Sequence, residues 1–169
     1  LVDLCRAHGL KLVEDCAHAL PARRGDGHVG TTGSDAAVFS FYANKTMTTG
    51  EGGMVLTANP DLAARVRLMR CHGIDRDAFA RFTTAANQWS YDVVEAGYKY
   101  NLTDIAAALG ITQLAEAEAN ARARTRAARR YDRVLGNLPL RRPPRPASGG
   151  HSWHLYPVWL TGRERARAR

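Results

Sequence analysis

The sequence predicts an α/β fold. Residues 1–8 have a helical pattern, and the apolar run at 10–15 is typical of a short strand buried in an α/β sheet. Two more strand patterns, at 36–43 and 54–57, precede a second helix that begins near residue 59. Alternation of helices and strands indicates helices packed on a sheet.

The remaining elements follow from local signals. Gly9 is placed to end the first helix, and residues 25–35, rich in Gly, Thr, Ser and Asp, are expected to form a loop. Asn59, followed by Pro60 and an acid, supplies an N-cap for the second helix, which Gly73 is expected to end.

The second half contains one long helix. Residues 74–98 are irregular, with Trp89 and Tyr91 expected in a hairpin or packed loop. A helical pattern then runs over 103–135, about 50 Å of helix, and is expected either to bend near Gly110 or to bridge two domains.

Prolines and glycines at 143–150 indicate a linker, and residues 151–160 are expected to form a strand in which Pro157 favours a sheet edge. We therefore expect three parts: residues 1–110 in a large domain, 111–135 as a connecting helix, and 136–169 as the start of a smaller domain.

Charge and cysteine content narrow the function. Residues 1–120 carry a net −3 and residues 121–169 a net +11, so a nucleic-acid-binding or regulatory module is one hypothesis. The alternating arginines and alanines of that segment fit a solvated helix better. The three cysteines show no zinc or disulfide spacing, and the sequence contains no long apolar run, so we expect a cytoplasmic protein that binds neither metal nor membrane.

Lys45 is the most informative residue. It is one of three lysines among twenty-one arginines, and it lies between an aromatic-rich strand and a glycine-rich turn. Unlike arginine, lysine can lose its proton and attack a carbonyl group. A surface lysine in a hairpin is the alternative interpretation.

Asp15 and Ser40 extend this hypothesis. Both come at the ends of predicted strands, where ligands of open α/β sheets gather. Pyridoxal phosphate needs a lysine for its aldehyde, an acid facing its ring nitrogen and donors for its phosphate. Lys45, Asp15 and Ser40 could supply these groups, although an aspartate after a strand can also be a turn residue.

Four segments then carry a family resemblance. Residues 14–19 (EDCAHA), 40–53 (SFYANKTMTTGEGG), 97–104 (GYKYNLTD) and 153–156 (WHLY) occur in order. Together the chain resembles the DegT/DnrJ/StrS family of pyridoxal-phosphate-dependent nucleotide-sugar aminotransferases. The resemblance implies a three-layer fold type I transferase and a homodimer with shared active sites. It also implies transfer of an amino group from glutamate or glutamine to a nucleotide-linked keto sugar.

The resemblance implies roles for individual residues. Lys45 would be the catalytic lysine joined to the cofactor, Asp15 would pair with the ring nitrogen, and Ser40 would donate to the phosphate. His18 would pack against the ring or reach its phenolic oxygen. A lysine at position 45 argues against the branch of the family that has histidine there and removes a hydroxyl group.

Further residues of the site are expected outside the central motif. Lys99 and Asn101 lie in the segment that the family sends into the partner's site; many members have Asn and Arg at these places, so either residue could contact the phosphate. Tyr42 and His154 are expected on the substrate side, and a packed strand histidine is the alternative for His154.

The resemblance covers only the middle of a family member, so this segment alone is expected to bind the cofactor poorly. A catalytically incomplete relative is a further hypothesis.

Overall fold

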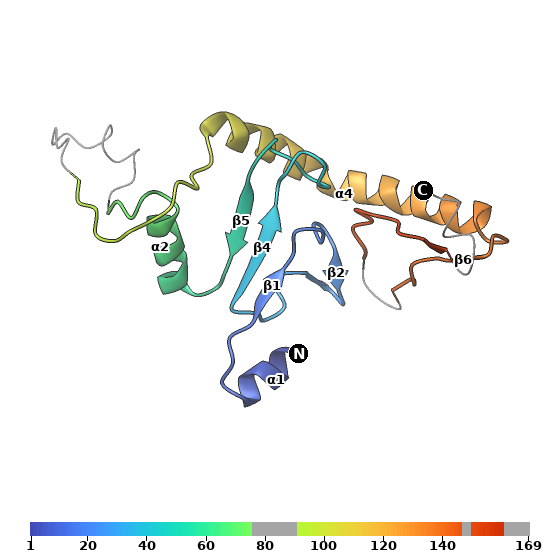
Figure 1. The fold of residues 1–169 in the computed structure, drawn as a ribbon, viewed down its shortest axis with the longest axis horizontal. Coiled ribbons are helices and arrows are strands. Elements are labelled where there is room, and N and C mark those ends of the chain that lie inside the picture. The colour runs from blue at the N-terminus through green and yellow to red at the C-terminus, as the bar shows by residue number, and fades with distance from the viewer. Residues whose placement is uncertain (76–90, 147–149, 161–169) are drawn as a thin grey trace.

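A three-stranded mixed sheet lies at the centre of the protein (Figure 1). The computed structural model describes residues 1–75, 91–146 and 150–160. Strand β1 (Val13–Asp15) runs parallel to β4 (Ala36–Ser40), which pairs antiparallel with β5 (Gly53–Leu56). The predicted α/β fold is therefore confirmed, and the strand expected from residue 10 begins only at Val13.

The two faces of the sheet differ in burial. Ala37 and Phe39 on β4 point into a core that also contains Cys16, Phe41 and Met47. Val13 and Val38, on the opposite face, are 62% and 42% exposed. The prediction of a buried first strand is wrong, because β1 lies at the edge of the sheet that the described residues form.

Helices flank the sheet. The short helix α1 (Val2–Ala7) precedes β1, and α2 (Pro60–Met69) follows β5. The N-cap predicted at Asn59 is confirmed, since its side-chain oxygen accepts hydrogen bonds from the backbone N–H groups of Asp61 and Leu62.

The longest element is α4 (Asp104–Val134), which crosses the end of the sheet to which β1 and β4 point (Figure 1). Thr103 caps it by accepting a hydrogen bond from the backbone of Ala106 at 3.2 Å. The helix is continuous through Gly110, so the domain boundary expected after residue 110 falls within α4. The division into domains stays a prediction. No helix among the described residues is long and apolar enough to cross a membrane.

Two local predictions were wrong. The loop expected at 25–35 begins inside a hairpin of β2 (Arg23–Arg24) and β3 (Gly27–His28). The strand expected over 151–160 is reduced to β7 (Trp159–Leu160), which pairs with β6 (Leu140–Arg141). Trp153 has a φ of 48°, a left-handed conformation incompatible with a strand.

The expectation for Trp89 lies outside the described residues, as does the part of the linker at 147–149.

Candidate functional site

The site begins where two parallel strands end. Asp15 is the last residue of β1 and pairs in register with Val38 on β4. Side chains alternate along a strand, so Ser40, two residues beyond Val38, lies on the same face of the sheet as Asp15. An acid and a hydroxyl group therefore share one face at the carboxyl end of adjacent strands.

Both side chains keep free hydrogen-bonding capacity. One carboxylate oxygen of Asp15 accepts a hydrogen bond from the backbone N–H of Ala17 at 3.0 Å, and this leaves the second oxygen for another partner. The Ser40 hydroxyl oxygen accepts from the N–H of Tyr42 at 3.4 Å, and its proton can be donated.

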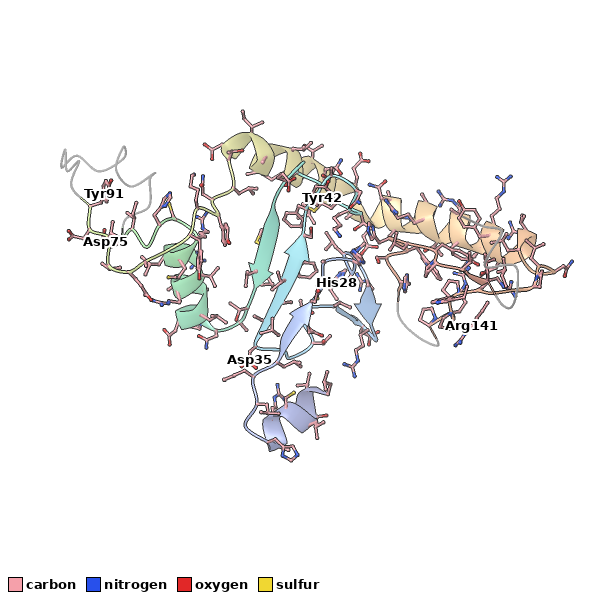
Figure 2. All side chains as sticks on the ribbon, viewed as in Figure 1. His28, Asp35, Tyr42, Asp75, Tyr91 and Arg141 are labelled. Atoms are coloured by element: carbon pink, nitrogen blue, oxygen red, sulfur yellow. The ribbon has the colours of Figure 1, made fainter. Side chains whose placement is uncertain are left out.

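Lys45 lies in a turn fixed by backbone hydrogen bonds. Its N–H donates to the carbonyl of Tyr42 at 2.9 Å, and the N–H of Thr49 donates to the carbonyl of Phe41 at 2.9 Å. Figure 2 shows Tyr42 where the end of β4 approaches α4. Thr49 is buried and Lys45 is half-buried, so a well-anchored turn presents the amine.

Two histidines meet beside this turn. The rings of His18 and His154 have centroids 4.3 Å apart and planes inclined by 45°. The Ser152 hydroxyl donates to the backbone carbonyl of His18, although the two residues are 134 positions apart. The segment at 152–154 is thus attached to His18, three residues beyond the end of β1.

The surroundings of His154 favour its neutral form. Burial lowers the pKa of its imidazole below the usual 6.5, and the charges of His18, Lys45 and Arg124 lower it further. Its Nδ1 atom is buried and has no hydrogen-bond partner in the part of the chain that the structure describes. The Thr46 hydroxyl, next to Lys45, donates to the backbone carbonyl of Leu20 at 2.6 Å, so the Lys45 turn is joined to the segment after β1 that contains His18.

The structure therefore brings together two groups of predicted residues: Asp15 with Ser40, and Lys45 with His18 and His154. A carboxylate, a hydroxyl group, an amine and imidazoles form a donor set that fits pyridoxal phosphate. If Asp15 and Lys45 bind one cofactor, their side chains must face one cavity, and we predict that they do. A cavity of about 970 Å³ between β5 and α2 is lined by Asn101 but by none of these five residues.

Lys99 and Asn101 lie in a different loop, which is held against the end of α2. The N–H of Tyr98 donates to the carbonyl of Met69 at 2.7 Å, and that of Tyr100 donates to the carbonyl of Arg70 at 2.9 Å. The Lys99 ammonium donates to the side-chain oxygen of Asn101. The rings of Tyr98 and Tyr100 stack 5.1 Å apart, and both are exposed.

Two residues of the site were missed in the sequence. Arg124 donates to the carbonyls of Trp153 and His154, and Ser152 binds the carbonyl of His18. Nothing in the sequence distinguishes Arg124 from the other arginines of its helix.

Comparison with known families gives one match over the whole chain. The sequence model of the DegT/DnrJ/EryC1/StrS aminotransferase family matches residues 1–169. A similar curated protein is the uncharacterized protein MJ1066 of Methanocaldococcus jannaschii, which is 43% identical over 161 residues. The match covers 95% of this chain and 41% of that protein, so the chain spans less than half of its relative.

Solved structures give the same result. One of them is PseC of Helicobacter pylori, described as an aminotransferase involved in the biosynthesis of pseudoaminic acid. It superposes with a TM-score of 0.82 at 32% sequence identity, and the match covers 95% of this chain and 41% of the PseC chain. The putative sugar aminotransferase Spr1654 of Streptococcus pneumoniae, solved in a PMP form and a PLP form, gives a TM-score of 0.80 for the PMP form at 30% identity. That match covers 94% of this chain and 41% of Spr1654.

Proposed function

Since the chain belongs to the DegT/DnrJ/EryC1/StrS aminotransferase family, we propose that the whole protein transfers an amino group to a nucleotide-linked keto sugar. The amino donor is glutamate or glutamine, and the cofactor is pyridoxal phosphate. The role of PseC in pseudoaminic acid biosynthesis and the PLP form of Spr1654 support the substrate class and the cofactor.

The observation that carries the proposal is the arrangement of Asp15, Ser40 and Lys45. The acid and the hydroxyl group share one face at the ends of parallel strands, and the amine follows on the anchored turn after the second strand. A turn lysine with only a surface role would not need these neighbours.

Each residue has a separate task in the proposed site. The cofactor, when bound, supplies an aldehyde for the amine and a ring that accepts electrons. The Asp15 carboxylate keeps a proton on the ring nitrogen, and the Ser40 hydroxyl donates to the phosphate. The Lys45 amine holds the cofactor and moves a proton to and from the substrate carbon. The His18 imidazole packs beside the ring.

The loop with Lys99 and Asn101 belongs to a different site in this proposal. Its exposed, stacked tyrosines and its attachment to α2 fit a segment that reaches into the partner's active site in a homodimer. Either Lys99 or Asn101 would then donate to the phosphate bound by the other subunit.

Reductive labelling of the full-length protein tests the lysine assignment. The purified protein is mixed with pyridoxal phosphate, reduced with borohydride and digested, and mass spectrometry locates the phosphopyridoxyl group. We expect the label on Lys45 and no label in Lys45→Arg, while Lys99→Arg is labelled like the wild type. A label on Lys99, or on a lysine outside this segment, would reject the proposed site.

The reaction is tested by supplying nucleotide-linked keto sugars with glutamate or glutamine and detecting an aminated sugar nucleotide by mass spectrometry. Labelling at Lys45 without any aminated product would keep the cofactor site and reject the substrate class.

A further inference from the structure

The turn at 152–154 is strained and yet well anchored. Trp153 has a φ of 48°, a conformation that costs a non-glycine residue free energy, so neighbouring contacts must stabilise it. The residue is 6% exposed, and its ring packs against His151 and Tyr156 with centroids 4.3 and 5.9 Å away. The Arg145 guanidinium lies 4.5 Å from the ring centroid of Trp153.

The backbone of the turn is bound by an arginine from another element. Arg124, near the middle of α4, donates from a single guanidinium nitrogen to the carbonyl of Trp153 at 3.3 Å and to that of His154 at 3.5 Å. It is half-buried, whereas Arg126, Arg129 and Arg130 on the same helix are exposed. Arg124 therefore has a specific structural contact within a run of solvated arginines.

The turn at 152–154 also contacts the candidate site. Ser152 is 3% exposed and binds the His18 carbonyl, while the His154 ring contacts the His18 ring. Because the buried Nδ1 atom of His154 has no hydrogen-bond partner among the described residues, the position of the ring depends on the backbone that carries it. Arg124 binds that backbone directly.

We propose that Arg124 is a positioning residue that fixes the turn at 152–154 and so holds the His154 imidazole against His18 in the candidate site. The inference deepens the proposed function, since it matters for catalysis only if Lys45 is the reacting amine. The connection runs from α4 through two backbone carbonyls to an imidazole, and no contact between Arg124 and the reacting atoms is involved.

The first test measures the position of His154 without relying on the cofactor or on activity. Diethyl pyrocarbonate modifies accessible, neutral imidazoles, and mass spectrometry of the full-length protein gives the modification rate of each histidine. In Arg124→Gln we expect modification of His154 to be at least about tenfold faster, because local opening of the turn becomes easier. The exposed His8 serves as the internal reference and should react at its wild-type rate.

Two further variants serve as controls. Arg130→Gln removes an exposed arginine from the same helix and should leave the His154 rate unchanged. Arg124→Lys should restore most of the protection, because one nitrogen makes both contacts and an ammonium can donate to the same carbonyls. An unchanged rate at His154 in Arg124→Gln, or equal acceleration at every histidine, would overturn the proposal.

The second test asks whether Arg124 acts through His154. In the cofactor-loaded, full-length enzyme we expect Arg124→Gln and His154→Ala each to lower kcat by about tenfold. The kcat of the double variant should be no lower than that of the less active single variant. Losses that multiply would show that Arg124 acts elsewhere and would contradict the proposal. If Lys45 is not the reacting lysine, the kcat measurements fail for all variants. The diethyl pyrocarbonate measurement still reports on the turn in that case.

Discussion

At the residue scale, the site depends on what each side chain can do that its closest substitute cannot. Lysine and arginine both carry a positive charge, but the guanidinium stays protonated at all accessible pH values. An imidazole can be neutral or charged near neutral pH, and its surroundings determine which. Lys45 and His154 are the two residues for which this distinction matters most.

Lys45→Arg in the full-length protein should lower turnover by at least about a thousandfold, because the covalent and proton-transfer contributions are lost together. The thermal midpoint should change little, since charge and length are nearly kept. Lys11→Arg is the matched control: Lys11 is exposed and pairs with Asp35 at 3.1 Å, a contact that arginine can keep. More than a few per cent of wild-type turnover in Lys45→Arg would contradict the assignment.

The pKa of His154 predicts a pH dependence of stability. Because its folded-state pKa lies below the usual 6.5, neutral His154 contributes stability that is present above pH 6.5 and is lost as the pH falls through the folded-state pKa. The pKa of His151 is also lowered, by burial and by Arg145, and acts in the same direction. In the cofactor-free, full-length protein the urea midpoint should fall on acidification.

His154→Gln removes one of these titrating groups and should show a smaller fall. His8→Gln, at the exposed end of α1, should keep the full pH dependence. An identical pH dependence in wild type and His154→Gln would refute the prediction.

At the element scale, α4 supports the turn that carries Lys45. Gly110 is buried in this helix, and a Cβ atom there would lie 3.0 Å from the Cγ2 atom of Thr49 and 3.5 Å from the Cε atom of Met47. Glycine inside a helix is unfavourable by itself, so its presence here is explained by the close approach of the turn. The helix and the turn fit only if this position has no large side chain.

Gly110→Leu should therefore destabilise the full-length protein by about 1–3 kcal/mol through overpacking and should displace the turn at 46–49. Thermal unfolding measures the first effect and turnover the second. Ala108→Leu, at an exposed position of the same helix, is the control and should behave like the wild type. Equal effects of the two substitutions would exclude this account of Gly110.

At the scale of the whole molecule, we predict a shared active site, because the two groups of residues lie on different segments of the chain. Lys45 lies on the turn beside α4, whereas Lys99 and Asn101 lie on the loop attached to α2. In a two-fold symmetric dimer, a segment that leaves its own site can complete the other one.

Subunit complementation checks this arrangement. The full-length Lys45→Arg protein and the double variant Lys99→Ala, Asn101→Ala should each be nearly inactive. After unfolding and refolding together in equal amounts, half of the dimers are mixed and each has one intact site, so about a quarter of wild-type activity should return. Failure to recover activity, or an active monomer in light scattering, would contradict the shared site.

The sequence by itself determined the features that depend on neighbouring residues. The N-cap at Asn59 is correct to the residue, because a cap is a contact between a side chain and backbone two or three positions away. The strand containing Ser40 and the turn containing Lys45 could also be predicted, since an apolar run followed by glycines is a local pattern.

The tertiary structure decided what depends on contacts between distant segments. The parallel pairing of β1 with β4 places Asp15 and Ser40 on one face, and no local pattern states which strands are neighbours. The turn at Trp153 replaced a predicted strand because Arg124 and the residues around its ring stabilise a conformation that the local sequence disfavours. His154 reached His18 for the same reason: the energy that selects this geometry comes from long-range packing, and residue order alone does not contain it.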